Sequence, residues 1–246
     1  DGITSVTLYP MFRMSQLLGA DTILSMYRMP PKAMFEEYMF SHLTGIKALD
    51  AVSDMDEYID YVCSLKPGLL RGHVRECVRK GVDAAGQITE EVSREIVRIS
   101  PKVLAVSSVF YQLNASLAII RRVKELCPGI RTLIGGPNCM GDAGEAILRY
   151  FPGVDAVFFG EGDEVFSETI RALEDGASLP YGALRLADLE RGKLSGDELP
   201  FRITKDMNNI PIPDYGDFMP YLSEITEDIA KLFFMGYGPD LNPVLL

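Results

Sequence analysis

Three turns of small and polar residues hold the groups best suited to binding a ligand in this sequence. Each turn directly follows a short apolar run, and these runs are Val103–Val106, Thr132–Ile134 and Ala156–Phe159. Small residues let a large ligand come close to the backbone, and the N–H groups of such turns can bind amide and phosphate oxygens. The turns therefore predict a binding site for a large ligand. We identify no catalytic residue and no metal ligand in the chain.

The candidate binding residues are those of the three turns. They are Ser107, Ser108, Val109, Phe110, Tyr111 and Gln112 in the first turn, Gly135, Gly136, Pro137, Asn138 and Cys139 in the second, and Gly160, Glu161, Gly162 and Asp163 in the third. One glycine-rich turn would be weak evidence, because glycines also end strands for structural reasons. Three such turns on one edge of a sheet are stronger evidence.

The first two turns also have structural interpretations. Ser107 and Ser108 could cap the helix that follows them, and Asn114 is a better candidate for that N-cap than for a ligand contact. Gly135 and Gly136 could allow close packing of a strand against a helix. These alternatives stay open at the level of sequence.

The third turn and Cys139 have similar alternatives. Glu161 and Asp163 could cap the helix that begins near Glu164, with or without touching a ligand. Cys139 is better explained as a buried small hydrophobe than as a nucleophile, because no His or Lys is its neighbour in sequence.

Helical patterns alternate with the three apolar runs and predict how the turns are positioned. These patterns cover Asn114–Cys127, Asp142–Phe151 and Glu164–Glu174. Strand and helix in alternation predict βαβ units and a parallel sheet buried on both faces. Open sheets of this kind bind ligands beyond the carboxyl ends of their strands, where all three turns would lie. The predicted fold class is α/β, with a doubly wound, flavodoxin- or Rossmann-like sheet.

The flanking regions add elements on both sides of this core. Before it, we expect a strand at Ser5–Tyr9 and helices at Met11–Pro31, Lys32–Leu43, Asp50–Ser64, Leu69–Lys80 and Thr89–Ile99, the last two separated by a turn around Ala84–Gly86. After it, we expect a small strand or hairpin at Gly182–Leu186, an extended connector at Arg202–Pro213 and a helix at Tyr221–Met235. The N-terminal helices would form an added layer on the α/β core.

Composition restricts the partners of the chain. The net charge of −11 over 246 residues argues against nucleic acid or an anionic membrane as the main partner. No apolar run approaches the ~20 residues needed to cross a bilayer. The four cysteines form no CxxC or CxxxCxxC cluster, and two histidines are too few for a multi-histidine metal site. A cytoplasmic protein with reduced thiols is expected.

Several common nucleotide-binding motifs are missing. No GxGxxG follows the first strand of the core, and the sequence has no GxxxxGK[ST] phosphate-binding loop. A phospho-acceptor domain would need an Asp at a strand end, where this chain has Ser107, Gly135 and Gly160. The site therefore favours a ligand other than a dinucleotide or a nucleoside triphosphate.

The turn sequences resemble the cobalamin-binding domain of B12-dependent radical SAM proteins, in the branch that matures ribosomal peptides and includes C-methyltransferases. The residues that carry the resemblance are Val106–Leu117, Gly135–Cys139, Phe151–Asp155 and Gly160–Asp163. It is strong over about residues 101–176 and moderate over the preceding helices and the Ile210–Asp214 segment. The implied organisation is a first strand and helical layer at 1–100, a cobalamin-binding core at 101–176, and a connector at 177–246 leading to a radical SAM barrel.

The resemblance implies a cofactor and roles for the three turns. The first turn would lie beneath the corrin ring, Gly135 and Gly136 would leave room for the nucleotide tail, and Gly160–Asp163 would line the far side of that tail channel. A side chain at Gly136 would then block cobalamin without unfolding the domain. The DxHxxG motif of other B12 domains is absent, so the cobalamin would be base-off and His-off, with Phe110, Tyr111 or Gln112 facing cobalt.

The resemblance also implies partners outside this chain. The parent enzyme would use a 4Fe–4S cluster and S-adenosylmethionine in its barrel, with a precursor peptide as substrate, to methylate or otherwise mature that peptide. The alternative is a degenerate domain that keeps the fold and binds a peptide or a sister domain without cobalamin.

A flavodoxin-like strand order would place one more strand between Ser5–Tyr9 and Val103–Val106. This sequence offers no such strand upstream, so we expect a gap in the sheet. A native N-terminal strand that precedes this sequence, the Pro243–Leu246 segment or a second chain would fill it.

Overall fold

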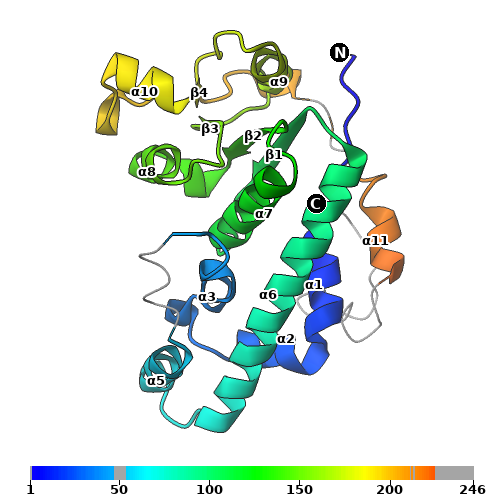
Figure 1. Ribbon diagram of the computed structural model, residues 1–246, viewed down its shortest axis with the longest axis vertical. Helices are drawn as coiled ribbons and strands as arrows, with labels where there is room; N and C mark the ends of the chain where they lie inside the picture. The colour runs from blue at the N-terminus through cyan, green and yellow to red at the C-terminus, as the bar shows by residue number, and fades with distance from the viewer. Residues whose placement is uncertain (1, 47–53, 211, 213, 225–246) are drawn as a thin grey trace.

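The computed structural model describes residues 2–46, 54–210, 212 and 214–224, and is built on a four-stranded sheet in the order β1-β2-β3-β4 (Figure 1). The strands β1 (Val103–Ser107), β2 (Arg131–Gly135) and β3 (Ala156–Phe158) run parallel, whereas β4 (Ala183–Leu184) runs antiparallel to β3. The predicted α/β class and the three core strands are confirmed. The small strand expected within Gly182–Leu186 is β4.

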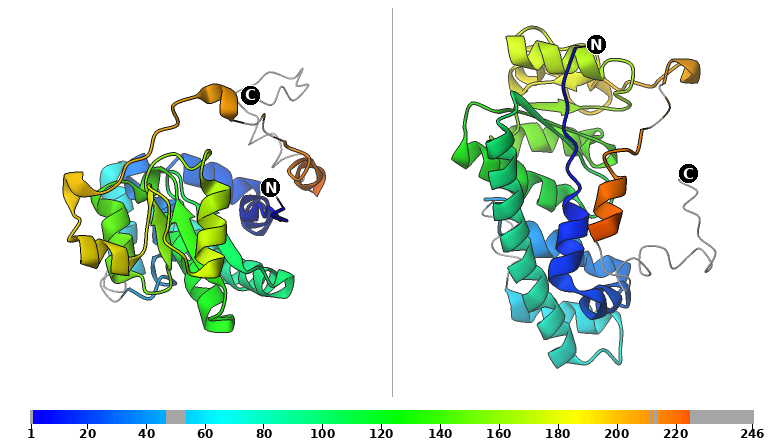
Figure 2. Two further views of the ribbon diagram at one scale, coloured as in Figure 1. Left: turned by 90° about the horizontal axis from the view of Figure 1, so that it is seen from above. Right: turned by 90° about the vertical axis from the view of Figure 1, so that its right-hand side faces the viewer.

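Helices cover both faces of the sheet. On one face lie α7 (Leu113–Leu126) and α8 (Asp142–Tyr150), and on the other lies α9 (Phe166–Asp175), as Figures 1 and 2 show. Neighbouring strand residues accordingly enter different cores, because side chains alternate along a strand. Val157 packs with Ile120 and Ile147 beneath α7 and α8, while Phe158 packs with Leu173 beneath α9. The predicted doubly wound arrangement is therefore confirmed.

An N-terminal helical layer packs against α7. Its elements are α1 (Pro10–Leu18), α2 (Ala20–Tyr27), the 3-10 turn η1 (Pro31–Ala33), α3 (Phe35–Ser41), α5 (Met55–Leu65) and α6 (Arg71–Ile99). The longest of them, α6, runs beside α7, and its Val78, Ala85 and Val92 share an apolar core with Val123 of α7. The expected helical addition to the core is present.

The boundaries of two predicted helices are wrong. Residues 71–99 form one continuous helix, with no turn at Ala84–Gly86. Ala84 and Ala85 are buried there, so their small size serves close packing rather than a break. The predicted helix Met11–Pro31 is divided at Gly19, whose positive φ of 73° ends α1.

The predicted strand at Ser5–Tyr9 is also wrong. Residues 2–9 have no regular secondary structure, and Val6 is 62% exposed. Tyr9 instead joins Phe12 of α1 in an aromatic cluster with Phe218 and Tyr221, and the ring centroids of Tyr9 and Phe218 lie 5.2 Å apart. Aromatic side chains bury a large apolar area. In this cluster they pack α1 against the helix at Met219–Glu224, and they do not pair residues 5–9 with a strand.

No strand lies on the outer side of β1 in the described part of the chain, which is where the additional strand was expected. β1 is the edge strand there, and it pairs directly with β2. Every β1 residue is at least partly exposed, so solvent reaches this edge and can pair with its backbone groups. The Pro243–Leu246 segment and most of the predicted helix Tyr221–Met235 lie outside the described residues. The visible part of that region is α11 (Met219–Glu224).

The amino-terminal end of the sheet is fixed by Asp155. Its carboxylate accepts hydrogen bonds from the Thr132 backbone N–H (2.8 Å) and from the Lys124 ammonium group (2.6 Å). The Thr132 hydroxyl in turn donates to the Gly153 carbonyl oxygen (2.6 Å). Charge-assisted bonds of this kind tie α7, β2 and the start of β3 together. The opposite, carboxyl end of the sheet is left for the three turns.

The segment after α9 returns to the sheet. It contains α10 (Leu186–Gly192) and the 3-10 turns η4 (Gly196–Glu198) and η5 (Met207–Asn209). Between the two 3-10 turns the chain is extended, and Arg202 forms a parallel bridge with Gly160 beyond the end of β3. Among the described residues, none of the helices combines the length and apolar character needed to span a bilayer.

Candidate functional site

The first predicted turn is a tight loop that exposes two aromatic side chains. It connects β1 to α7, and it is closed by the Gln112 side-chain oxygen, which accepts the Val109 N–H (3.1 Å). Tyr111 adopts a left-handed conformation with φ of 58°. As a result Phe110 is 78% exposed and Tyr111 39% exposed. Exposed aromatic side chains on a rigid loop provide flat apolar surface for a ligand.

The first and second turns are joined through Ser108, which is fully buried. Its N–H donates to the Gly135 carbonyl oxygen (2.8 Å), and its hydroxyl accepts a hydrogen bond from the Asn138 side-chain amide (3.0 Å). The Asn138 backbone N–H also donates to the Ser108 carbonyl oxygen (3.3 Å). Pro137–Cys139 forms the 3-10 turn η3 that presents Asn138 for these contacts. The two loops therefore form one rigid unit at the carboxyl edge.

Gly136 has a structural reason to lack a side chain. Its φ is 96°, which disfavours any residue with a Cβ, and a Cβ built there would lie 2.6 Å from the Ser108 carbonyl oxygen. The glycine thus allows two loop backbones to approach each other. The position of Gly136 beside the predicted tail channel remains a proposal. The expectation that a side chain at Gly136 would leave the fold intact is not consistent with the close approach to Ser108.

The third turn is bound by a segment from the C-terminal part of the chain. We call this segment, residues 201–204, the strap. The Glu161 N–H donates to the Arg202 carbonyl oxygen (2.9 Å), and the Glu161 carboxylate accepts the Thr204 N–H (2.6 Å). Arg202 also forms an ion pair with Glu164 (2.9 Å). Gly160 has a φ of 99°, and a Cβ there would overlap the backbone of Arg202.

The helix-capping roles considered for residues of the first and third turns are not observed at α7 or α9. The N-cap of α9 is Val165, with no side-chain cap, so Glu161 and Asp163 do not cap it. The N-cap of α7 is Gln112, likewise without a side-chain cap. Ser107 and Ser108 therefore have another role, and the idea that Asn114 is the N-cap is wrong.

The free backbone N–H groups at the start of α7 are bound by a residue that the sequence did not reveal. The carboxylate of Glu37, on α3, accepts the backbone N–H groups of Leu113 (2.9 Å) and Asn114 (2.8 Å). The Asn114 side-chain amide donates back to the Glu37 carbonyl oxygen (3.0 Å). A negative charge at a helix N-terminus is favourable and satisfies donors that the helix cannot. Glu37 is 76 residues away from Leu113, so no local pattern could reveal it.

We expect replacement of Glu37 by Ala to lower the free energy of unfolding by about 1–2 kcal/mol, because two helix N–H groups lose their acceptor. Urea denaturation followed by circular dichroism measures this loss. The matched control is Glu36→Ala on the same helix, which should change stability by no more than about 0.5 kcal/mol. Equal losses in the two variants would contradict the capping role.

Cys139 is a packed thiol. It is fully buried in the core beneath α8, and burial raises the pKa of its thiol to about 12. A thiol with so high a pKa stays protonated at neutral pH, whereas the thiolate is the nucleophile. This agrees with the interpretation of Cys139 as a buried small hydrophobe.

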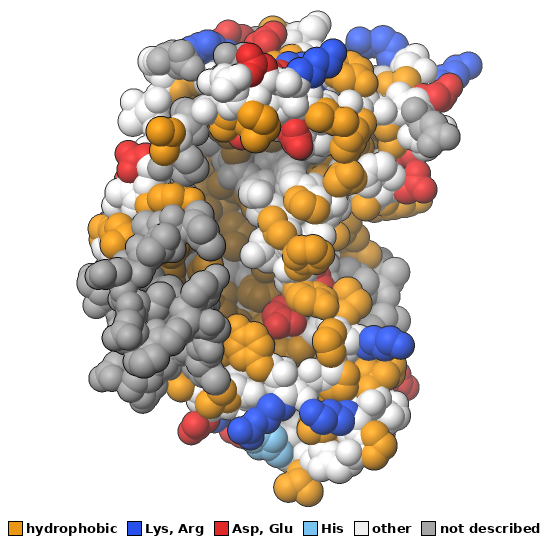
Figure 3. Space-filling model, turned by 180° about the vertical axis from the view of Figure 1, so that it is seen from behind, with side chains coloured by type: hydrophobic (Ala, Val, Ile, Leu, Met, Phe, Trp, Pro, Cys, Tyr) orange, Lys and Arg blue, Asp and Glu red, His pale blue; other side chains and the backbone are white. Residues whose placement is uncertain are grey.

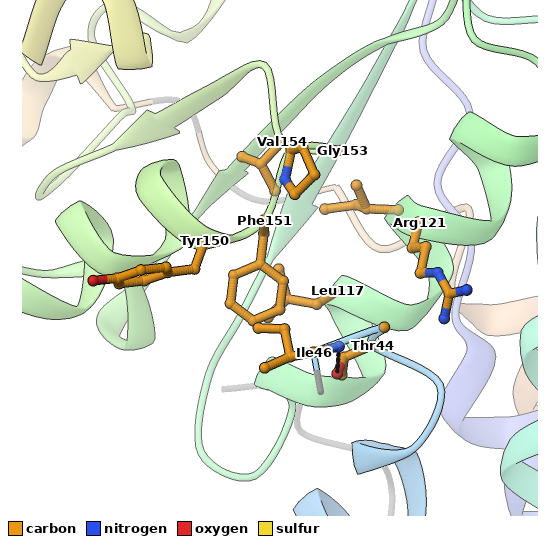
Figure 4. A pocket seen from close by; sticks show the side chains of 11 residues that line it. Thr44, Ile46, Leu117, Arg121, Tyr150, Phe151, Gly153 and Val154 are labelled. Atoms are coloured by element: carbon orange, nitrogen blue, oxygen red, sulfur yellow. Dashed lines mark hydrogen bonds between the residues drawn. The ribbon is translucent and has the colours of Figure 1, made fainter. Parts of the chain in front are cut away.

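One cavity lies at the other, amino-terminal end of the sheet. It has a volume of about 170 Å³ and is lined by residues that include Ile46, Leu117, Arg121 and Phe151 (Figure 4). The Arg121 guanidinium is already engaged, since it donates to the Leu43 carbonyl oxygen (3.0 Å) and pairs with Glu125 (2.9 Å). A second cavity of about 30 Å³ lies between α1, α6 and α11. Neither belongs to the three turns.

The surface offers apolar contact area near the strap. Phe201 and Ile203 are 45% and 58% exposed, while Arg202 between them faces Glu164. Met140, which follows the second turn, is 43% exposed. Figure 3 shows that apolar side chains gather around a hollow on the rear face of the molecule.

The described residues contain no group of three or more His, Cys, Asp or Glu side chains placed to hold a metal ion. His73 lies on α6 in the helical layer, where its Nε2 is 2.9 Å from the Ser25 hydroxyl and 3.8 Å from the Cys77 sulfur. The Ser25 hydroxyl donates to the Asp21 carbonyl oxygen (2.8 Å), so it accepts from His73. His42 ends α3. Neither histidine belongs to the three turns.

Comparison with known proteins gives two matches. Residues 67–170 match the family described as the B12 binding domain, so this part of the chain, with all three turns, is a B12-binding domain. The chain is also similar to an uncharacterized methyltransferase of Pyrococcus horikoshii, with 28% identity over 130 residues. The aligned part is 53% of this chain but only 28% of that protein. No solved structure matches the chain.

Proposed function

We propose that this chain, whose residues 67–170 are a B12-binding domain, holds cobalamin at the carboxyl edge of its sheet for a B12-dependent radical SAM enzyme. The observation that carries the proposal is the match over all three turns, two of which form one rigid unit through Ser108. A rigid, preformed edge loses little conformational entropy when a large ligand binds. The similarity to a methyltransferase supports methyl transfer as the chemistry.

The first turn fits the corrin ring. Phe110 and Tyr111 present aromatic surface to solvent, and burying such surface against a macrocycle is favourable. The cobalamin, when bound, would supply the methyl group. The residues of this chain would bind the ring, orient it and exclude water from its lower face.

The rest of the reaction would take place on other parts of the enzyme. A 4Fe–4S cluster and S-adenosylmethionine would belong to a radical SAM barrel, since this sequence has no CxxxCxxC cluster. The barrel and a precursor peptide would be the partners of the cobalamin face. The net charge of −11 favours these partners over nucleic acid.

The decisive experiment is a titration of the purified chain with hydroxocobalamin, followed by absorbance and equilibrium dialysis. We expect Phe110→Ala to weaken binding about tenfold, because one aromatic face is lost from beneath the ring. The control is Tyr150→Ala on α8, an aromatic residue that is 69% exposed but lies outside the three turns. Failure of the unaltered chain to bind any corrinoid, either hydroxocobalamin or the tail-less diaquacobinamide, would refute the proposal.

The mode of ligation can be tested in the same titration. Neither histidine lies in the three turns, so we propose base-off binding without a histidine ligand. Replacing both His42 and His73 by Ala should therefore leave the absorbance spectrum of the bound cobalamin unchanged. A spectral change on either substitution would show that a histidine nitrogen binds cobalt.

A second candidate function has one observation in its favour. Part of the third turn is already occupied, because Gly160 and Glu161 bind the strap. A degenerate domain that binds a peptide or a sister domain without cobalamin would show this feature. Binding of a precursor peptide by a chain that does not bind hydroxocobalamin would favour this alternative.

A further inference from the structure

Phe158, the last residue of β3, fills the space between the second and third turns. Its side chain belongs to the core beneath α9 and is only 5% exposed. Three glycines from different segments surround it. A Cβ on Gly135 would lie 3.3 Å from Phe158 Cβ, one on Gly162 would lie 3.7 Å from Cε1, and one on Gly182 would lie 3.1 Å from Cζ.

Of these glycines, Gly182 makes room for the aromatic ring, because a Cβ there would crowd its Cζ, while Gly162 contacts the ring and Gly135 contacts the Cβ. Two of them, Gly135 and Gly162, belong to the turns that would border the nucleotide tail of cobalamin. The side chain of Phe158 therefore lies against both turns, with its Cβ next to Gly135 and its ring next to Gly162. Protein cores are close-packed, so a tail could not enter the space between the two turns unless the ring moved.

On the other face of the sheet, the neighbouring residue Phe159 fills the core beneath α8. Phe159 points beneath α8, where a Cβ on Gly144 would lie 2.5 Å from its Cε1. Cys139 of the second turn is fully buried in the same core. Removing the Phe159 ring would leave a hole enclosed by α8 and Cys139, whereas removing the Phe158 ring would leave one bordered by glycines of two predicted binding turns.

We propose that Phe158 determines corrinoid specificity by closing the route of the nucleotide tail. The chain would then accept a corrinoid that lacks the tail at least as readily as complete cobalamin. The inference rests on the proposed function, since it assumes that the corrin ring binds at the first turn. The ring needs the surface of Phe110 and Tyr111, while the tail alone needs the space that Phe158 fills.

The test compares hydroxocobalamin with diaquacobinamide, a corrinoid that has the same ring and no nucleotide tail. Dissociation constants are measured for the full chain and for Phe158→Ala, Phe158→Leu and Phe159→Ala. We expect the unaltered chain to bind cobinamide as tightly as cobalamin or more tightly. Phe158→Ala should shift the ratio of affinities about tenfold or more toward cobalamin, because a bulky clash is relieved.

Phe159→Ala is the matched control, since it removes the same ring from the opposite face. It should lower stability in the same way but leave the ratio of affinities unchanged. Phe158→Leu, which keeps the core filled, should give a smaller shift in the same direction and serves if the alanine variant does not fold. An unchanged ratio in a folded Phe158 variant overturns the inference, as does an equal shift in Phe159→Ala.

Failure of the proposed function gives a different result. If the unaltered chain binds neither corrinoid, there is no cobalamin site at the first turn, and both proposals fall. If cobinamide binds to every folded variant and only the ratio fails to shift, the corrin site stands and the role of Phe158 is refuted.

Discussion

Replacing Gly160 by Ala will detach the strap from the sheet and lower the free energy of unfolding by about 3 kcal/mol. Two costs combine at this position. The φ of 99° lies where a residue with a Cβ is strained, and the new Cβ would overlap the backbone of Arg202. Backbone atoms of a bridged segment cannot rotate away as a flexible side chain can, so the strap must move. Thermal and urea denaturation measure the loss of stability.

The control for this prediction separates the two costs. Gly176 also has a positive φ (68°), but a Cβ there would meet nothing within 4 Å. Gly176→Ala should therefore cost only about 1 kcal/mol, from the backbone conformation alone. Limited proteolysis supplies a second measurement, because a detached strap should be cleaved faster in Gly160→Ala than in Gly176→Ala. Equal stability and equal cleavage in the two variants would mean that strap and turn are not in tight contact.

The strap gives the third turn a role beyond binding a ligand. Glu161 and Glu164 hold Thr204 and Arg202, so the chain after the strap begins at the carboxyl edge of the sheet. In the described structure, Arg202 Nε and the Thr204 hydroxyl are buried without a hydrogen-bond partner. Unsatisfied buried groups cost free energy, and the backbone contacts of the strap must offset that cost.

The core of the fold could be predicted from the sequence because its signals are local. The runs at Val103, Thr132 and Ala156 are short, apolar and bounded by turn residues, and each is a strand within about one residue of the expected limits. The alternation of strands and helices then fixed the parallel topology and the edge where the turns meet. The same local reasoning failed at Ser5–Tyr9, which is β-prone but has no regular secondary structure.

The features that the sequence did not reveal depend on distant contacts. The Glu37 cap joins residues 76 positions apart, and the strap contact between Glu161 and Thr204 spans 43. Small residues were also ambiguous. Ala84 and Ala85 predicted a turn but are buried where helices pack, and Gly135 predicted an open channel but lies against Phe158. A missing side chain shows that something comes close, and only the fold shows whether it is a ligand or the chain itself.

Gly136 gives the second large expected effect. Sequence reasoning predicts that a side chain here blocks cobalamin and spares the fold. The structure changes this expectation, because a Cβ would lie 2.6 Å from the Ser108 carbonyl oxygen at a φ of 96°. We therefore expect Gly136→Ala to lower the free energy of unfolding by about 3 kcal/mol and to separate the first turn from the second. Urea denaturation and hydroxocobalamin affinity are measured on the same samples.

Gly141 is the matched control, since it has a positive φ (54°) just beyond the same turn and a Cβ there would meet nothing within 4 Å. Gly141→Ala should cost about 1 kcal/mol and leave cobalamin affinity unchanged. If Gly136→Ala is as stable as Gly141→Ala but has lost cobalamin, the glycine serves the ligand, as the sequence alone suggests. If stability and affinity fall together, the glycine serves the contact with Ser108, and the site depends on it because the two turns bind as one unit.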